Sequence, residues 1–201
     1  NVVASAASEL NGSRDVCRVE ECEMGNLIAD AMLARVKSQG IQIAIQNSGG
    51  IRASIEAGEV TMGDVLAVLP FQNTLSTFQV SGQTIIDALE NGVSQVEEVK
   101  GRFPQVAGLK FTWDVSVAPN EGRIQDVMVA KDGTYAPIDP AATYGVVSNN
   151  YVRGGGDGYK MFRDAANVYD FGPDLADVVA EYLAGEEGGY QQSLGGRIMK
   201  K

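Results

Sequence analysis

A glycine-rich segment carries the residues of this chain that are best suited to holding a ligand. Residues 149–159 read Asn-Asn-Tyr-Val-Arg-Gly-Gly-Gly-Asp-Gly-Tyr. Three consecutive glycines cost backbone entropy in a helix or a strand, so they indicate a tight turn or a close approach of the backbone to another group. Tyr151 and Asp157 flank these glycines and add an aromatic face and a carboxylate to their backbone N–H groups. The combination is suited to a flat polar ligand with hydroxyl groups, such as a ribonucleoside.

Other candidate residues lie outside this segment. The motif Asn-Ser-Gly-Gly-Ile-Arg at 47–52 is suited to binding an anion through its backbone N–H groups, with the Arg52 guanidinium as a charged partner. Phe71 follows a proline in Leu-Pro-Phe-Gln-Asn at 69–73. Each feature also has an ordinary interpretation. Ser-Gly-Gly is a common turn, an isolated phenylalanine belongs more often to the core, and Arg18, taken alone, is a surface residue.

The absence of histidine restricts the chemistry that this chain can perform. None of its 201 residues is histidine, and only two are cysteine. Histidine is the commonest general acid–base near neutral pH and the commonest ligand of transition metals. Histidine-based catalysis and a transition-metal site within this chain are therefore excluded, and only an oxygen-liganded ion such as magnesium or calcium would remain possible.

Composition and charge narrow the class of partner. The chain is 44% hydrophobic, as expected of a globular core, and 16 basic against 26 acidic residues give a net charge of −10. This charge argues against nucleic acid and anionic membranes as partners. No apolar run is long enough to predict a membrane span. The amino terminus has neither an initiator methionine nor the features of a signal peptide, so we expect a mature product or a piece of a longer one.

The two cysteines, Cys17 and Cys22, have four residues between them. They are either two reduced thiols or a disulfide that closes a short loop. The even count and close spacing favour a disulfide, which would stabilise the fold by about 2 kcal/mol and would indicate an oxidising compartment. Two buried, reduced cysteines remain the alternative.

Hydrophobic periodicity predicts the elements that must position these residues. Helices are predicted at 24–37, 62–68, 81–89 and 174–184, and strands at 41–46, 75–80, 109–115, 124–129 and 144–148. Helices alternate with strands early in the chain and a hairpin occupies its middle, without an internal repeat or linker. We therefore expect a single α+β domain over 1–201, with a mixed β-sheet and flanking helices. Both glycine loops follow strands, so we expect them side by side at one edge of the sheet.

The order of the motifs is more specific than any one of them. Cys-Arg…Glu-Cys-x-Met-Gly-Asn-Leu is followed by Asn-x-Gly-Gly-Ile-Arg, Leu-Pro-Phe-x-Asn and Asn-x-x-x-Gly-Gly-Gly-Asp-Gly-Tyr. This series resembles the C-terminal domain of the 5′-nucleotidase and UDP-sugar hydrolase family, over residues 17–197. The Cys17–Cys22 pair is similar to the disulfide of the vertebrate members, which implies an extracytoplasmic location.

The resemblance also implies a role for each candidate residue. Phe71 and Tyr151 would sandwich the base, Asn47 and Asn73 would meet its edge, Asp157 would accept from the ribose hydroxyls, and Arg18 and Arg52 would lie near ribose and phosphate. Tyr151 departs from the phenylalanine usual at the second aromatic position. Because stacking uses the ring, the sequence predicts that Tyr151→Phe binds about as well as the parent.

In this family an N-terminal metallophosphoesterase domain holds two metal ions and the catalytic residues, and the C-terminal domain binds the nucleotide. The resemblance implies that this chain binds a nucleotide or nucleoside and holds no catalytic residue, metal or cofactor. The catalytic domain of the same polypeptide would be its partner and is absent from 1–201. The implied function is substrate binding in a metal-dependent 5′-nucleotidase-like phosphohydrolase of extracytoplasmic nucleotides. A free-standing nucleoside-binding module and an interaction domain whose glycine loops are only turns are the alternatives.

Overall fold

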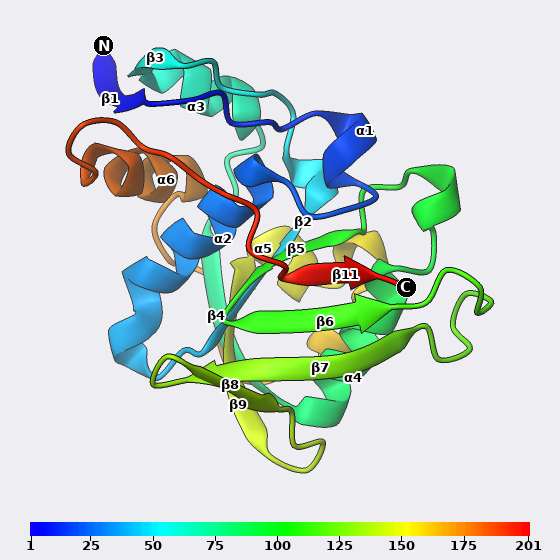
Figure 1. Cartoon of the computed structure of the whole chain (residues 1–201). Coiled ribbons are helices and arrows are strands. Elements are labelled where there is room, and N and C mark those ends of the chain that lie inside the picture. Colours follow the sequence, from blue (N-terminus) through cyan, green and yellow to red (C-terminus); the bar gives the residue numbers. More distant parts are fainter.

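The computed structural model describes all 201 residues and contains three β-sheets with helices packed around them (Figure 1). The strands are β1 (Val2–Ala6), β2 (Ile43–Asn47), β3 (Gly58–Thr61), β4 (Leu75–Ser81), β5 (Pro104–Ala107), β6 (Leu109–Trp113), β7 (Ile124–Lys131), β8 (Thr134–Pro137), β9 (Thr143–Asn149), β10 (Ala166–Tyr169) and β11 (Ile198–Lys200). The α-helices are α1 (Arg14–Cys17), α2 (Glu23–Val36), α3 (Met62–Val68), α4 (Gly82–Gly92), α5 (Asn150–Arg153) and α6 (Leu175–Ala184). Short 3-10 helices are η1 (Lys37–Gln39), η2 (Ser48–Gly50), η3 (Val96–Glu98), η4 (Gly156–Gly158) and η5 (Lys160–Phe162). No helix has both the length and the hydrophobicity required to cross a bilayer.

The central sheet has the strand order β10-β4-β9-β2-β5. Within it, β2 and β9 are parallel and every other pair is antiparallel. A second sheet, β11-β6-β7-β8, is also mixed, because β11 runs parallel to β6. The strands β1 and β3 form a small third sheet. The predicted α+β class with mixed sheet and flanking helices is confirmed, but the strands divide among three sheets, because the central hairpin forms its own sheet with β11.

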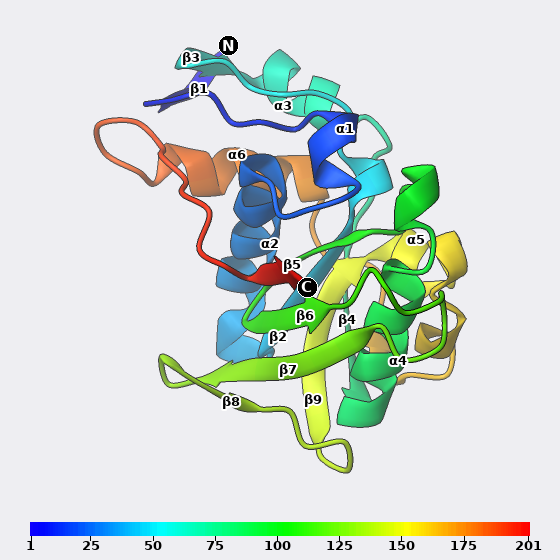
Figure 2. The ribbon, with the colours of Figure 1, turned by 45° about the vertical axis from the view of Figure 1, so that its right-hand side comes forward.

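Both faces of the central sheet are buried. Along β2, Ile43 and Ile45 belong to one hydrophobic core and Ala44 to the other, because successive side chains of a strand point to opposite faces. Val146 and Val147 of β9 divide in the same way. One core lies under α2 and α6, and the other lies between the sheet, α4 and the second sheet. The position of the second sheet beside the vertical strands is visible in the turned view (Figure 2).

The boundaries of several elements follow from capping. Thr61 and Asp64 form the predicted capping box at the start of α3, with the Thr61 side chain accepting from the Asp64 N–H and the Asp64 carboxylate accepting from the Thr61 N–H. Asp174 caps α6, as its position before an apolar periodic segment indicates. Gly40, with φ of 79°, ends the helical segment that begins with α2.

The strand predicted at 109–115 is too long, because β6 ends at Trp113. The Asp114 carboxylate accepts from the backbone N–H and the hydroxyl of Ser116, and this local turn replaces further strand pairing. The short strands β1, β3, β5, β8, β10 and β11 were not predicted. They have three to five residues each and lack the extended alternation of apolar and polar residues that indicated strands at 41–46 and 109–115.

The cysteines form a disulfide, with their Cα atoms 5.2 Å apart. Both are buried, and Gln105 of β5 braces the loop that they close. Its Nε2 atom donates to the carbonyl oxygens of Cys17 and Glu20, at 2.9 and 2.8 Å, and its Oε1 atom accepts from the Cys22 N–H at 3.2 Å. Disulfide and amide together hold Arg18, the second residue of the loop, against the central sheet.

The same loop anchors the C-terminal strand. The buried Glu21 carboxylate accepts from the backbone N–H groups of Gly195, Arg197 and Ile198, at 3.0, 2.7 and 3.3 Å. It also accepts from Asn26 Nδ2 at 2.8 Å. One carboxylate thus joins the disulfide loop to β11, which lies beside β6 (Figure 1).

We expect protein made in an oxidising compartment to show no alkylatable thiol before reduction, as measured by mass spectrometry of the denatured chain. The Cys17→Ala/Cys22→Ala variant should lose about 2 kcal/mol of free energy of unfolding in chemical denaturation, because the disulfide restricts the unfolded chain. Two alkylatable thiols in unreduced protein, or an unchanged free energy of unfolding in the variant, would contradict this expectation.

Candidate functional site

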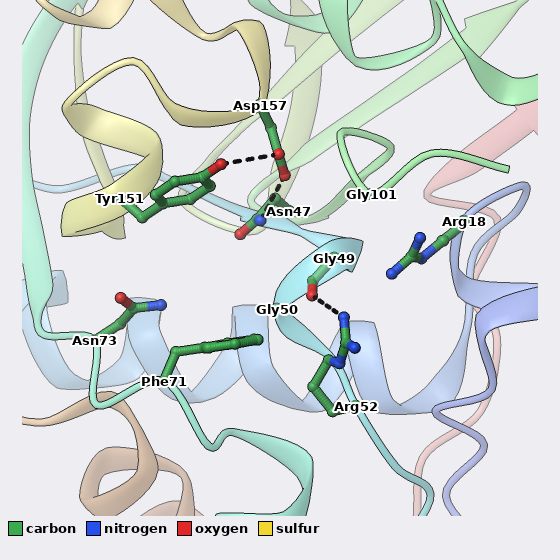
Figure 3. Close-up of a pocket in the computed structure, with 10 residues that line it drawn as sticks. All are labelled: Arg18, Asn47, Gly49, Gly50, Arg52, Phe71, Asn73, Gly101, Tyr151 and Asp157. Carbon is green, nitrogen blue, oxygen red and sulfur yellow. Dashed lines mark hydrogen bonds between the residues drawn. The ribbon is translucent and has the colours of Figure 1, made fainter. Parts of the chain in front are cut away.

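One cavity of about 460 Å³ collects every residue that the sequence nominated for binding, and its size is typical of small-molecule sites. Its lining consists of Arg18, Asn47, Gly49, Gly50, Arg52, Phe71, Asn73, Gly101, Tyr151 and Asp157. Figure 3 shows the two aromatic rings toward one end and the two arginines toward the other. The seven candidate residues come from four separate loops, and the predicted meeting of the two glycine loops is confirmed.

The meeting of the glycine loops follows from the parallel pairing of β2 with β9. Both strands deliver an asparagine at the same end, Asn47 and Asn149, and the loops begin there. Asn149 Nδ2 donates to Asn47 Oδ1 at 2.8 Å and to Gln46 Oε1 at 3.0 Å. Its own Oδ1 accepts from the Val152 N–H at 2.9 Å and caps α5. This role of Asn149 was not predicted, although an asparagine at a strand end before a helical turn is a typical N-cap.

The two aromatic side chains are open to solvent. Phe71 is 55% exposed and Tyr151 is 50% exposed, although both belong to a domain with large buried cores. Their loops are joined by reciprocal hydrogen bonds between Thr74 and Asn150: the Asn150 N–H donates to Thr74 O at 3.0 Å, and the Thr74 N–H donates to Asn150 Oδ1 at 3.1 Å. The Arg52 guanidinium lies 5.6 Å from the Phe71 ring centroid. The alternative that Phe71 is a core residue is wrong.

The glycines of the 154–156 run shape the turn and do not line the cavity. The N–H groups of Gly154 and Gly155 donate to the carbonyl oxygens of Asn150 and Val152 and so end α5. A Cβ atom on Gly156 would lie 2.4 Å from Cζ of Tyr151, so only glycine allows the ring to pack over this backbone. The expectation that Gly154 and Gly155 offer free N–H groups to a ligand is wrong.

Backbone N–H groups of the 47–52 loop likewise form hydrogen bonds within the protein. The N–H groups of Gly49, Ile51 and Arg52 donate to the carbonyl oxygens of Gly101, Ser48 and Val68. These N–H groups are therefore not available to an anion, contrary to the sequence expectation. Gly49 and Gly101 pack backbone against backbone, since a Cβ on Gly101 would lie 2.7 Å from the Gly49 Cα. Arg52 is the residue of this loop whose side chain supplies positive charge to the cavity.

Three arginines supply positive charge near one end of the cavity. Arg18, only 9% exposed, donates from Nη1 to Val99 O at 3.3 Å, and its buried Nε has no partner. Burial lowers the pKa of Arg18, and the neighbouring charges of Arg14 and Arg52 lower it further. None of the three forms an ion pair. A second cavity of about 220 Å³ adjoins the first and is lined by all three. The sequence analysis missed Arg14, which precedes Arg18 by one helical turn.

Asp157 lies between the aromatic and the basic ends (Figure 3). Its Oδ2 atom accepts from Asn47 Nδ2 at 2.8 Å, and its Oδ1 atom accepts from the Tyr151 hydroxyl at 3.2 Å. Asp157 has φ of 53°, and Asn91 Nδ2 donates to its carbonyl oxygen at 3.0 Å. Burial, followed by the Asp157 charge, raises the pKa of Tyr151. The side-chain amide of Asn73, which lines the cavity, makes no hydrogen bond within the protein and is available to a ligand.

Comparison with known proteins identifies the family. Residues 2–164 match the family model described as the 5′-nucleotidase, C-terminal domain. The chain belongs to this family. The trifunctional nucleotide phosphoesterase of Bacillus subtilis is 42% identical over 175 residues, and rat 5′-nucleotidase is 35% identical over 188 residues. Each match covers 87% of the chain, but only 12% and 33% of these proteins. The 5′-nucleotidase C-terminal domain therefore spans a minor part of its curated relatives.

A solved structure shows the same fold. The 5′-nucleotidase precursor from Thermus thermophilus superposes with a TM-score of 0.95 at 44% identity, covering all of this chain and 39% of that chain. The NAD nucleotidase of Haemophilus influenzae superposes with a TM-score of 0.86 at 26% identity and covers all of this chain. The arrangement of sheets and loops described above is thus the arrangement of 5′-nucleotidase C-terminal domains.

We expect Phe71→Ala and Tyr151→Ala each to change the free energy of unfolding by no more than about 1 kcal/mol, because both rings are half exposed. The matched control is Phe78→Ala, since Phe78 is 1% exposed and its truncation should cost about 3–5 kcal/mol through lost burial and a cavity. Chemical denaturation of the three variants checks this. A loss at Phe71 as large as that at Phe78 would show that its ring supports the fold.

Proposed function

We propose that the chain is the nucleotide-binding domain of a metal-dependent 5′-nucleotidase-like phosphohydrolase. Residues 1–201 form one binding domain in this proposal. A metallophosphoesterase domain of the same polypeptide supplies the catalytic centre and two divalent metal ions. The family membership supports this assignment, as do the relatives named for nucleotidase and nucleotide phosphoesterase activity.

The observation that carries the proposal is the order of chemical groups along the cavity. Two exposed aromatic rings suit the two faces of a base, and each base–aromatic contact contributes roughly 1–3 kcal/mol. The Asn73 and Asn47 amides suit the polar edge of the base, although Asn47 already shares one N–H with Asp157. The Asp157 carboxylate suits the ribose hydroxyls. Arg18 and Arg52, with Arg14 behind them, suit the phosphate because they carry charge without an ion-pair partner.

The residues of this chain do not fit the metal centre that the family implies. No group of three or more cysteine, aspartate or glutamate side chains is arranged to hold an ion, and the chain has no histidine. In the proposal this domain therefore binds and orients the nucleotide and contributes no catalytic residue. The hydrolytic chemistry belongs to the other domain.

We further propose an extracytoplasmic location. The Cys17–Cys22 disulfide supports it, because disulfides persist in oxidising compartments and are rare in the cytosol. The alkylation measurement described with the fold tests this location when it is made on protein from the natural host. Two free thiols there would contradict it.

Removal of either aromatic ring should weaken nucleoside binding. We expect Phe71→Ala and Tyr151→Ala each to raise the Kd for the preferred nucleoside by a factor of about 5 to 150, because each removes one stacking face. Titration calorimetry with adenosine and with uridine measures this and also identifies the preferred base. Phe171→Ala is the matched control, since Phe171 is 82% exposed and lies outside the cavity lining. Unchanged affinity in both cavity variants would show that the two rings do not stack on the base.

The chain by itself should not hydrolyse nucleotides. We expect no phosphate release from AMP with added manganese, zinc or cobalt, because the chain lacks a ligand set for a two-metal centre. Colorimetric phosphate assays on protein freed of contaminating phosphatases check this, with buffer as the blank. Turnover that follows the protein through a second purification step would contradict the proposal that this domain contributes no catalytic residue.

A further inference from the structure

The Tyr151 hydroxyl contacts the one carboxylate of the cavity. Asp157 accepts two side-chain hydrogen bonds, one on each oxygen, from Asn47 Nδ2 and from the Tyr151 hydroxyl (Figure 3). A carboxylate oxygen has two lone pairs, so each oxygen keeps one for a ligand. The carboxylate can therefore accept from two adjacent hydroxyl groups at once. The orientation of the carboxylate decides whether it reaches both hydroxyl groups.

The two donors and the backbone together define that orientation. The Asp157 backbone is held by Asn91 Nδ2, which donates to its carbonyl oxygen. The side chain can still rotate about its own bonds, and the hydrogen bonds on Oδ1 and Oδ2 restrict this rotation from both sides. With Asn47 alone, one oxygen would be fixed and the other would not. The hydroxyl thus adds a constraint that a phenylalanine ring cannot supply.

The tight turn explains how the hydroxyl reaches Asp157. Tyr151 and Asp157 belong to the same glycine turn, and the ring packs on Gly156, where a Cβ atom would clash with it. The hydroxyl is therefore placed at Oδ1, at 3.2 Å. This distance is long for an O–H···O hydrogen bond, so the expected contribution is at the modest end of the range for such bonds.

We propose that the Tyr151 hydroxyl is a positioning group that orients the Asp157 carboxylate for the vicinal hydroxyls of a ribose, and that it thereby favours ribosides over deoxyribosides. The inference rests on the proposed function, namely that the cavity binds nucleosides. It replaces the sequence expectation that Tyr151→Phe binds as well as the parent. That expectation holds only for ligands without the vicinal hydroxyls.

The test compares two ligands that differ only in these hydroxyls. Kd values of the parent and of Tyr151→Phe are measured by calorimetry for adenosine and 2′,3′-dideoxyadenosine, or for the uridine pair if uridine binds more tightly. We expect the variant to bind the riboside about 2- to 12-fold more weakly, as for the loss of one hydrogen bond, and to bind the dideoxy ligand as the parent does. Tyr169→Phe is the matched control, because the Tyr169 hydroxyl makes no hydrogen bond and lies outside the cavity lining.

A double-mutant cycle shows whether the hydroxyl acts through Asp157. In an Asp157→Ala background, Tyr151→Phe should no longer change riboside affinity, because the group that the hydroxyl orients is gone. A merely structural role of the hydroxyl would weaken both ligands equally and would persist in that background.

The outcomes separate the two proposals. If the parent binds neither nucleoside, the proposed function and this inference both fail. If the parent binds but does not distinguish the riboside from the dideoxy ligand, the inference alone fails. It also fails alone if Tyr151→Phe leaves the ratio of their Kd values unchanged. A smaller ratio in Tyr151→Phe, an unchanged ratio in Tyr169→Phe and no effect in the Asp157→Ala background support it.

Discussion

The cavity depends on a chain of buried amide hydrogen bonds where β2 and β9 end together. Gln46 and Asn47 accept from Asn149, and Asn47 donates onward to Asp157. Because the members at the strand ends are buried, an unmade bond there would cost about 1–3 kcal/mol, so the network favours a single arrangement of the two loops. The parallel pairing of β2 with β9 brings the two loops together, and the amide hydrogen bonds fix their alignment. The carboxylate at the end of this network thus accepts from Asn47, which lies 110 positions away in the chain.

The glycines and the polar side chains of the two loops have different roles. The glycines permit close approaches, such as the Tyr151 ring over Gly156, while their N–H groups at 154 and 155 complete α5. In the proposed function, the negative charge of the ligand is recognised by the side chains of Arg18 and Arg52. Of these, Arg18 is buried and is held by a loop that a disulfide, Gln105 and the C-terminal strand all restrain. Arg18 is therefore held in place although no carboxylate is paired with it.

The distribution of charge matches this arrangement. The chain has a net charge of −10, yet three arginines without ion pairs gather at one end of the cavity. An acidic surface disfavours extended polyanions, whereas a local basic end attracts a small one. The aromatic rings are also kept apart from the cores that stabilise the fold. Affinity and stability can therefore change independently at Phe71.

The sequence by itself determined what is local: the boundaries of α3 and α6 from their caps and the apolar faces of the helices. The seven cavity residues were named through the resemblance of their motifs to a known family. The sequence did not determine which groups satisfy one another, so the glycine N–H groups were assigned to a ligand, Asn149 and Arg14 were given no role, and the hydrogen bond between Tyr151 and Asp157 was not predicted. The three-sheet division was also missed, since strands of three to five residues acquire their pairing only from distant partners. Hydrogen bonding between Asn47 and Asp157, 110 positions apart, is decided by tertiary structure because local propensity contains no information about contacts across that distance.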